Sequence, residues 1–242
     1  VIVILEKNAE NGSSVKKSEA DDDDAYYLAN VTKLGAMNLQ TLLGYISTGS
    51  YVALDDKTDT TMLIDLGLDG AFGMFGFETE FQYKSNQFDA EGRPDDFSLY
   101  GFMFDGWFNL GAAKLGGVFA YGSVDKDSGA AFGFGDDFDG HGSHILGNEI
   151  GFGGADMIYG STFFAIYGNY AASDALSFWA QFAYAMANSD AVNEEDTFWD
   201  FSATGKYKLT DAVTYAVGFG YAQQDYKDND LVEDPDAGTK LF

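Results

Sequence analysis

Hydrophobic and polar residues alternate one by one through much of this chain. In Met74–Ser85, "MFGFETEFQYKS", one parity holds Phe75, Phe77, Phe81 and Tyr83, and the other holds Gly, Glu, Gln and Lys. Successive side chains of a β-strand point to opposite faces of the sheet. The pattern therefore predicts a strand with one aromatic face and one charged face.

The same period-2 alternation recurs along the chain and predicts about eleven strands. They are expected at residues 1–7, 25–34, 37–47, 61–72, 74–84, 97–110, 113–124, 162–172, 175–187, 197–209 and 212–223. Most of these segments have ten residues or more, whereas strands of soluble proteins average about five to six.

Short connections and a regular spacing indicate hairpins. The short connections are centred on Gly35, Gly73, Gly111, Ser173 and Asp211, residue types that tight turns require. Three of the four spacings are 38 residues, and the spacing from Gly111 to Ser173 is 62, which is 38 plus an insertion of 24. Such a period predicts a repeating unit of two long strands, one tight turn and one longer loop.

The remaining connections are long and acidic, so the sequence predicts an up-and-down meander with turns at one end and loops at the other. The 24-residue insertion falls in the loop at 125–161, which is rich in glycine and partly apolar. Two placements are open for this loop. It either folds into a barrel as a constriction, or lies outside as an ordered loop or a subunit contact.

Strand length and the two unlike faces favour a barrel in a membrane. A membrane-spanning strand needs about 9–11 residues. In water, about eleven long strands would enclose an interior too wide for side chains to fill. We therefore expect an all-β, transmembrane, antiparallel up-and-down β-barrel, with lipid against the aromatic face and water against the charged face. Tyrosines near the strand ends suit interfacial girdles; they are Tyr83, Tyr121, Tyr170, Tyr184, Tyr207 and Tyr221.

The composition of the chain argues against several classes of protein. The formal net charge of -26 makes nucleic acid an unsuitable partner, since phosphate contacts need Lys and Arg. The chain has no cysteine, so disulfides and thiolate metal sites are excluded. Its 22 Phe and 15 Tyr argue against disorder in spite of the acidity. No apolar run reaches the roughly 18 residues of a transmembrane helix.

Hairpins such as "LTDAVTYAVGFGYAQQD" and "AASDALSFWAQFAYA" resemble those of Gram-negative outer-membrane porins. The resemblance covers nearly the whole chain, but it is a style of hairpin and not a sharp motif. It implies a diffusion channel of about 16 strands in the outer membrane, assembled as a homotrimer and in contact with lipid and lipopolysaccharide.

Two features depart from the porin pattern. An odd number of strands is not expected in a single-chain bacterial barrel. The chain begins with "VIVILEK", as if within a strand, and "AGTKLF" is short for a final strand, although Phe242 is a suitable last residue. We therefore expect residues 1–242 to be one barrel domain of a longer chain whose missing strands are mostly N-terminal.

Charged residues on the polar parity are candidates for a pore wall. They are Asp65, Asp69, Glu78, Glu80, Lys84, Asp105, Lys114, Asp200, Lys206 and Lys208. One interpretation is a wall that sets ion selectivity. The other is a set of ordinary solvated side chains. A preference for cations is expected mainly from the field of the acidic loops at the channel mouth.

Three oxygen-rich loop segments could bind Ca²⁺, or could simply be solvated acidic loops. They are Asp21–Asp24, Asp55–Thr60 and Asp139–His144, and none has the spacing of an EF-hand. The only histidines, His141 and His144, give two ligands without a third. No cofactor is expected.

Four functions remain open on these grounds. The first is a passive channel for ions and small hydrophilic solutes, with a preference for cations. The second is a conduit barrel that sheathes a partner such as a periplasmic electron carrier. The third, a barrel enzyme, needs a nucleophile and base for which no motif is present, so an enzyme is not expected. The fourth is a soluble β-rich surface protein.

Overall fold

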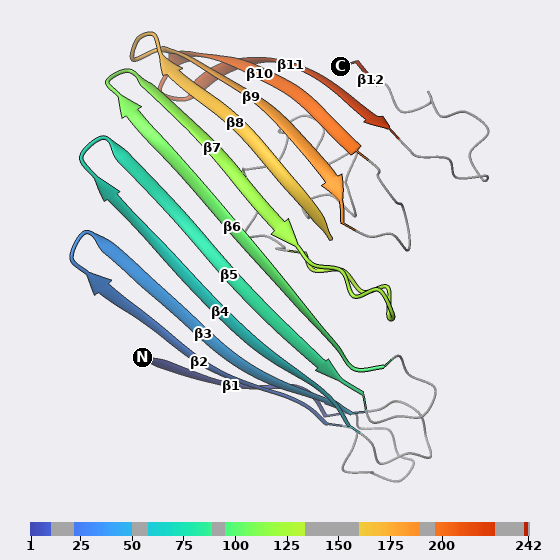
Figure 1. Ribbon diagram of the computed structural model, residues 1–242. Coiled ribbons are helices and arrows are strands. Elements are labelled where there is room, and N and C mark those ends of the chain that lie inside the picture. The colour runs from blue at the N-terminus through green and yellow to red at the C-terminus, as the bar shows by residue number, and fades with distance from the viewer. Residues whose placement is uncertain are drawn as a thin grey trace.

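The computed structural model describes residues 1–10, 22–49, 58–88, 95–133, 160–188, 197–225 and 240–241. Within these ranges the chain forms strands and turns only, and contains no helix that could cross a membrane (Figure 1). The strands are β1 (Ile2–Glu10), β2 (Asp22–Leu34), β3 (Met37–Gly49), β4 (Thr58–Phe72), β5 (Phe75–Gln87), β6 (Phe97–Leu110), β7 (Ala113–Gly122), β8 (Ser161–Ala171), β9 (Leu176–Ala187), β10 (Thr197–Thr210), β11 (Val213–Asp225) and β12 (Lys240–Leu241). The predicted all-β meander is confirmed.

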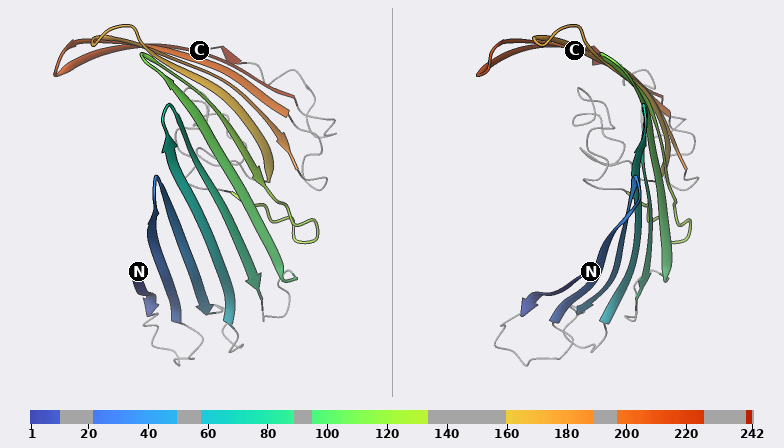
Figure 2. Two further views of the ribbon diagram at one scale, coloured as in Figure 1. Left: turned by 60° about the vertical axis from the view of Figure 1, so that its left-hand side comes forward. Right: turned by 90° about the vertical axis from the view of Figure 1, so that its left-hand side faces the viewer.

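Each strand pairs in antiparallel fashion with the next in the chain, so one sheet runs in order from β1 to β12. The sheet curves like part of a cylinder wall, with β1 and the β11–β12 pair at opposite edges (Figure 2). Among the described residues these two edges are not paired with each other, so the wall is open.

All five tight turns lie at one end of the sheet (Figure 1). Three of these turns begin at a glycine with positive φ: Gly35 at 66°, Gly73 at 60° and Gly111 at 64°. An L side chain rarely adopts this left-handed conformation, whereas glycine does so at no steric cost. A Cβ at these three positions would meet nothing within 4 Å, so the backbone conformation and not the space explains the glycine.

Several strands run further toward the loop end than the alternation predicts, whereas β7 ends at Gly122, two residues before its predicted end at 124. Asp22–Asp24 belong to β2 and Thr58–Thr60 to β4, although the sequence places both in loops. Backbone pairing continues past the last alternating residue because it needs only N–H and C=O groups. The segment "AGTKLF", considered short for a strand, contributes the two-residue β12 beside β11.

The two faces of the sheet differ in exposure as well as in composition. The exposed large hydrophobic side chains of β4 to β11 all lie on one face, which we call the aromatic face. The buried side chains lie on the other, the charged face. Side chains inside a curve converge and cover one another, whereas those outside diverge. The charged face is therefore the concave one.

The packed core also sits on the concave face, between β6 and β11. Its members are small or medium side chains, with three phenylalanines. They are Leu99, Met103, Val118, Ala120, Phe132, Phe163, Ala165, Ala183, Ala185, Phe198 and Ala222.

Ring contacts link neighbouring strands across the aromatic face. Phe119 lies 5.1 Å from Phe164, and near the loop end Trp199 lies 5.2 Å from Tyr221, measured between ring centroids. Trp199 and Tyr207 lie eight positions apart on β10, both on this face. At about 3.3 Å per residue the two rings are on the order of 26 Å apart along the strand. At a strand tilt of about 40° this corresponds to roughly 20 Å across a membrane, somewhat less than the roughly 25 Å apolar band of outer-membrane barrels.

Large rings on the concave face lie over glycines of the neighbouring strand. Trp107 is the register partner of Gly76, and Tyr167 is the partner of Gly116. A Cβ on Gly76 would lie 2.5 Å from the Trp107 ring, and one on Gly116 would lie 2.2 Å from the Tyr167 ring. Both glycines are therefore required for these rings to lie flat on the sheet.

Candidate functional site

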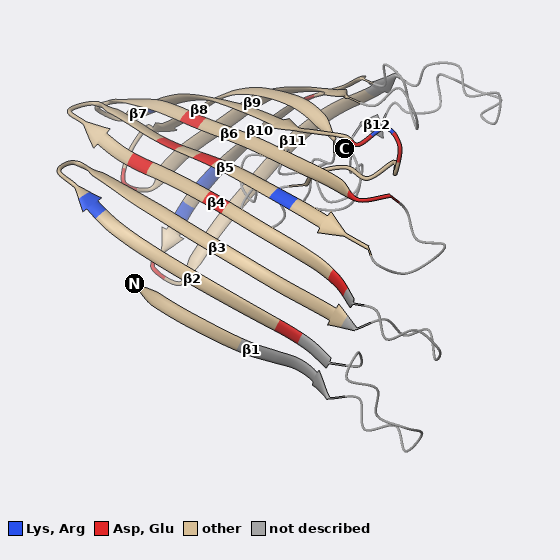
Figure 3. Ribbon diagram, turned by 60° about the horizontal axis from the view of Figure 1, so that its bottom comes forward, with Lys and Arg blue, Asp and Glu red and all other residues tan. Residues whose placement is uncertain are grey.

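All ten predicted pore-wall residues lie on the concave charged face. The register shows this, because directly opposed residues of paired strands share a face. Asp69, Glu78 and Asp105 are successive partners on β4, β5 and β6. Asp65 and Glu80 occupy neighbouring rows on β4 and β5. Figure 3 marks the acidic positions of the described strands in red.

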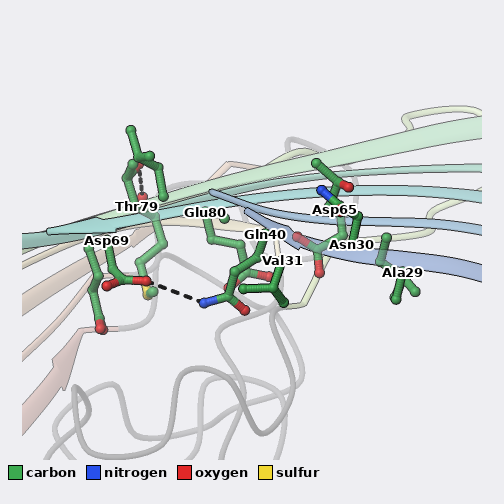
Figure 4. A pocket seen from close by; sticks show the side chains of 14 residues that line it. Ala29, Asn30, Val31, Gln40, Asp65, Asp69, Thr79 and Glu80 are labelled. Carbon is green, nitrogen blue, oxygen red and sulfur yellow. Dashed lines mark hydrogen bonds between the residues drawn. The ribbon is translucent and has the colours of Figure 1, made fainter. Parts of the chain in front are cut away.

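The three opposed carboxylates form a row across adjacent strands, which we call the acidic row: Asp69, Glu78 and Asp105. Like charges directly opposite one another are destabilising unless they have compensating partners. Asp69 has two such partners. The Asn38 amide donates to its Oδ2 at 2.8 Å. The Gln40 amide donates to its Oδ1 at 3.4 Å (Figure 4).

Asp105 is stabilised by a tyrosine from two strands away. It is 3% exposed, and the Tyr167 hydroxyl lies 3.0 and 2.9 Å from its two carboxylate oxygens. A buried carboxylate is costly unless it is hydrogen-bonded, so this contact offsets part of the cost of burying Asp105.

A hollow of about 490 Å³ lies beside the acidic row, between β2 and β6. Asp65, Asp69, Glu78 and Glu80 contribute its carboxylates. Neutral polar residues such as Gln40 and apolar residues such as Val31 complete the lining (Figure 4). The Gln82 amide donates to Glu80. The region thus combines negative charge with apolar surface on the concave side of the wall.

Lysines lie toward the ends of the strands. Lys114, Lys206 and Lys208 are within five residues of a tight turn, and Lys84 lies toward the loop end. The Lys114 ammonium lies 4.1 Å from the centroid of the Trp107 ring and 5.4 Å from that of Tyr167. Lys208 instead forms an ion pair of 2.7 Å with the exposed Asp211 in the adjacent turn.

The structure does not gather the ten residues into one cluster. Asp65, Asp69, Glu78, Glu80 and Asp105 lie together on β4 to β6. The candidates on β10 are Asp200, Lys206 and Lys208, four strands from β6. Asp200 is fully buried, with Ala183 and Ala222 opposite it.

The base of the long loop docks on the charged face. Phe132 is 1% exposed, and its ring lies where a Cβ on Gly101 would be, 2.1 Å away. The Lys84 ammonium lies 5.3 Å from the centroid of this ring. The Phe132 amide donates to the carbonyl of Ser123 at 2.8 Å, and its carbonyl accepts from the amide of Gly160 at 2.8 Å. Residues 134–159 of the loop at 125–161 lie outside the described residues.

Several residues of this site were not predicted from the sequence. Trp107 and Tyr167 are aromatic residues on the polar parity of their strands, and this exception to the alternation is the signal that identifies them. Lys33, the partner of Asn38, also lies on the charged face. Phe132 gives no comparable signal, because it lies in a loop without periodicity.

The metal hypothesis falls largely outside the described residues. His141, His144, Asp21 and residues 55–57 lie there, whereas Asp22–Asp24 and residues 58–60 are in strands. In the described ranges no group of three or more Asp, Glu or His side chains is arranged to hold a metal ion.

No protein-family model matches this chain, and no curated protein matches its sequence. Several solved structures are similar to it. OccK1 of Pseudomonas aeruginosa is 10% identical over 94% of this chain and 56% of its own, with a TM-score of 0.52. The outer-membrane protein OprD of Pseudomonas aeruginosa is 11% identical over 96% of this chain and 69% of its own, with a TM-score of 0.47. OmpT, an outer-membrane protein of Vibrio cholerae, is 14% identical over 91% of this chain and 59% of its own, with a TM-score of 0.48.

The chain spans less than two thirds of the length of OccK1 and of OmpT. At such identities the likeness to OccK1 concerns the fold alone: an all-β, up-and-down sheet of the outer-membrane β-barrel class. The bacterial outer membrane is the location that the sequence predicts.

Proposed function

We propose that this chain forms part of the wall of an outer-membrane channel through which ions and small hydrophilic solutes diffuse, with a preference for cations. The observation that carries the proposal is the pairing of two unlike faces on one curved sheet. The convex face is aromatic and exposed, and the concave face bears the carboxylates and lysines. Hydrocarbon suits the first face and channel water suits the second.

The preference for cations is supported by the acidic row. Its three carboxylates lie on adjacent strands of the charged face, toward the tight-turn end of the sheet. The net charge of -26 adds a negative field over the whole chain. Rings of Asp and Glu side chains are a common basis of cation selectivity, because they raise the local concentration of positive ions. The proposal assigns no catalytic step to any residue.

Docking of Phe132 supports a narrowing of the channel by the loop at 125–161. The ring and its backbone hydrogen bonds hold residues 130–133 against the concave face near Lys84. A loop anchored on that side of the wall starts inside the curve, so part of the lumen would be taken up by loop residues.

The assembly that accompanies this function is a homotrimer surrounded by lipid and lipopolysaccharide, as the resemblance to porins implies. Cross-linking of the full-length protein in native membranes tests it. A ladder that ends at three subunits is expected, and a monomer alone would remove the trimer from the proposal without affecting the channel.

The channel itself is tested by single-channel recording of the full-length protein in a planar bilayer with a KCl gradient. Steady ohmic conductance with a reversal potential on the cation side is expected. Protein shown to be folded and inserted, yet without conductance, would overturn the channel and favour a plugged barrel or one that sheathes a partner.

A further inference from the structure

Lys114 is the one predicted pore-wall lysine for which the described structure shows two aromatic rings around the ammonium. Gly116 of β7 lies directly opposite Tyr167 of β8 and, on its other side, Trp107 of β6. Lys114 lies two residues from Gly116 on the same face and places its ammonium 4.1 Å from the Trp107 centroid and 5.4 Å from the Tyr167 centroid. The bare backbone of Gly116 leaves room for this arrangement.

The two rings form a surface suited to cations in general. The face of an aromatic ring carries negative electrostatic potential and attracts ammonium groups within about 6 Å of its centroid. Tyr167 donates its hydroxyl to Asp105, which places a negative charge at the hydroxyl end of its ring. Trp107 and Tyr167 are held flat by the glycines beneath them, so the rings need little reorganisation to receive a ligand.

We propose that Trp107, Tyr167 and Asp105 form a binding site for organic ammonium ions, and that Lys114 occupies this site as a tethered competitor. The proposal rests on the proposed channel function, since a solute reaches the concave face through the lumen. The class of ligand is set by the rings, which favour a weakly hydrated ammonium over the strongly hydrated K⁺.

The tether has a direct consequence for transport. An attached ligand competes at an effective concentration in the millimolar range, so a free ammonium ion below that range does not displace Lys114. Conduction requires sites that solutes leave as readily as they enter. By occupying the site, Lys114 thus prevents the acidic, aromatic-lined wall from trapping the organic cations that the wall attracts.

Tryptophan fluorescence tests the site without reference to conductance. The probe is tetramethylammonium chloride, titrated into the folded full-length protein against equal NaCl. Lys114→Met keeps an unbranched side chain and removes the charge. The apparent affinity of this variant for tetramethylammonium should be roughly tenfold higher than that of the natural protein. Lys114→Arg should behave as the natural protein does, because it restores a tethered cation.

Two further variants complete the test. Lys206→Met removes a lysine of the same face on β10 and should leave the titration unchanged. Tyr167→Leu combined with Lys114→Met should abolish the saturable response, since one ring of the site is gone while Trp107 remains as the fluorescent reporter. Heat-modifiable migration in SDS gels verifies folding of every variant. An unchanged titration of Lys114→Met, or a saturable response in the double variant, would overturn the proposal.

Bilayer recording separates this proposal from the channel function. With KCl on both sides, tetramethylammonium should reduce the current of Lys114→Met at concentrations that leave the natural protein open. If tetramethylammonium does not reduce the KCl current of Lys114→Met, the site is not part of the conducting path and this part of the proposal is overturned. Saturable binding in fluorescence together with absence of any KCl current would uphold the site and overturn the channel.

Discussion

The hydroxyl of Tyr167 lies 3.0 and 2.9 Å from the two carboxylate oxygens of Asp105, although 62 residues separate the two in sequence. The contact crosses β7 diagonally, because Tyr167 pairs with Gly116 and Asp105 pairs with Val118. Because Gly116 has no side chain, the Tyr167 ring lies over β7 and its hydroxyl reaches the Asp105 carboxylate.

Tyr167→Phe should destabilise the folded protein by about 1–3 kcal/mol, because it removes a donor from a buried carboxylate. The measurement is the free energy of unfolding from urea titration in lipid vesicles. Tyr170→Phe is the matched control, since Tyr170 is exposed on the aromatic face of the same strand. Equal effects of the two substitutions would show that the bond to Asp105 does not stabilise the fold.

Gly76→Ala should displace the Trp107 ring and cost about 1–3 kcal/mol. The added Cβ would lie 2.5 Å from the ring, a distance that the ring cannot keep. We expect lower stability and a red-shifted tryptophan emission, as the ring becomes more hydrated. Gly67→Ala is the control, because its Cβ would meet only Gln40 at 3.4 Å. Unchanged emission of Gly76→Ala would contradict the close packing.

Ile166→Arg should cost about 2–4 kcal/mol in lipid vesicles, because it places a charge at the centre of the lipid-facing surface of β8. Ile166 is 66% exposed on the aromatic face. Asn169→Arg adds the same charge to the same strand on the concave face and should change stability by less than about 1 kcal/mol. A larger penalty for Asn169→Arg would reverse the assignment of the two faces.

Neutralising the acidic row should weaken the preference for cations. In the channel proposed here, the triple variant Asp69→Asn, Glu78→Gln and Asp105→Asn should lower the K⁺/Cl⁻ permeability ratio by at least about twofold. The ratio follows from the reversal potential in a KCl gradient. Asp211→Asn removes one charge at an exposed turn and should have a small effect. An unchanged ratio in the triple variant would leave the loops as the source of selectivity.

The loop base gives a prediction about pH. Hydrogen bonds from the Ser128 amide and hydroxyl to the carboxylate, each 2.8 Å long, lower the pKa of Asp125 below its ordinary value of 3.8. A lowered pKa means that the turn is favoured above pH 3.8 and loses this support as the pH falls through the lower, folded value. Ser128→Ala should raise the pKa of Asp125 toward 3.8, but not fully, because the amide donor remains.

Carbon-13 NMR titration of the Asp125 carboxyl group checks this prediction. Asp125→Asn identifies the resonance by its disappearance. A pKa of Asp125 that is the same with and without the Ser128 hydroxyl would assign the shift to the backbone alone.

The sequence by itself determined the strands, their two faces and the tight turns. Each depends on neighbouring residues: the alternation around Phe75–Tyr83 defines two faces, and the glycines at 35, 73 and 111 supply turn conformations that other residues adopt poorly. The meander follows, because a two-residue turn can join only antiparallel neighbours. All ten candidate wall residues consequently lie on the face that their parity predicts.

Tertiary structure alone decided which charges meet. The acidic row depends on the register between three strands, and the contact of Tyr167 with Asp105 depends on glycine in the strand between them. The docking of Phe132 on Gly101 and the place of Lys114 over two rings have the same origin. Such contacts arise where side chains far apart in sequence converge on a concave surface. Local alternation gives each strand its face, whereas pairing and curvature of the whole sheet select the neighbours of each side chain.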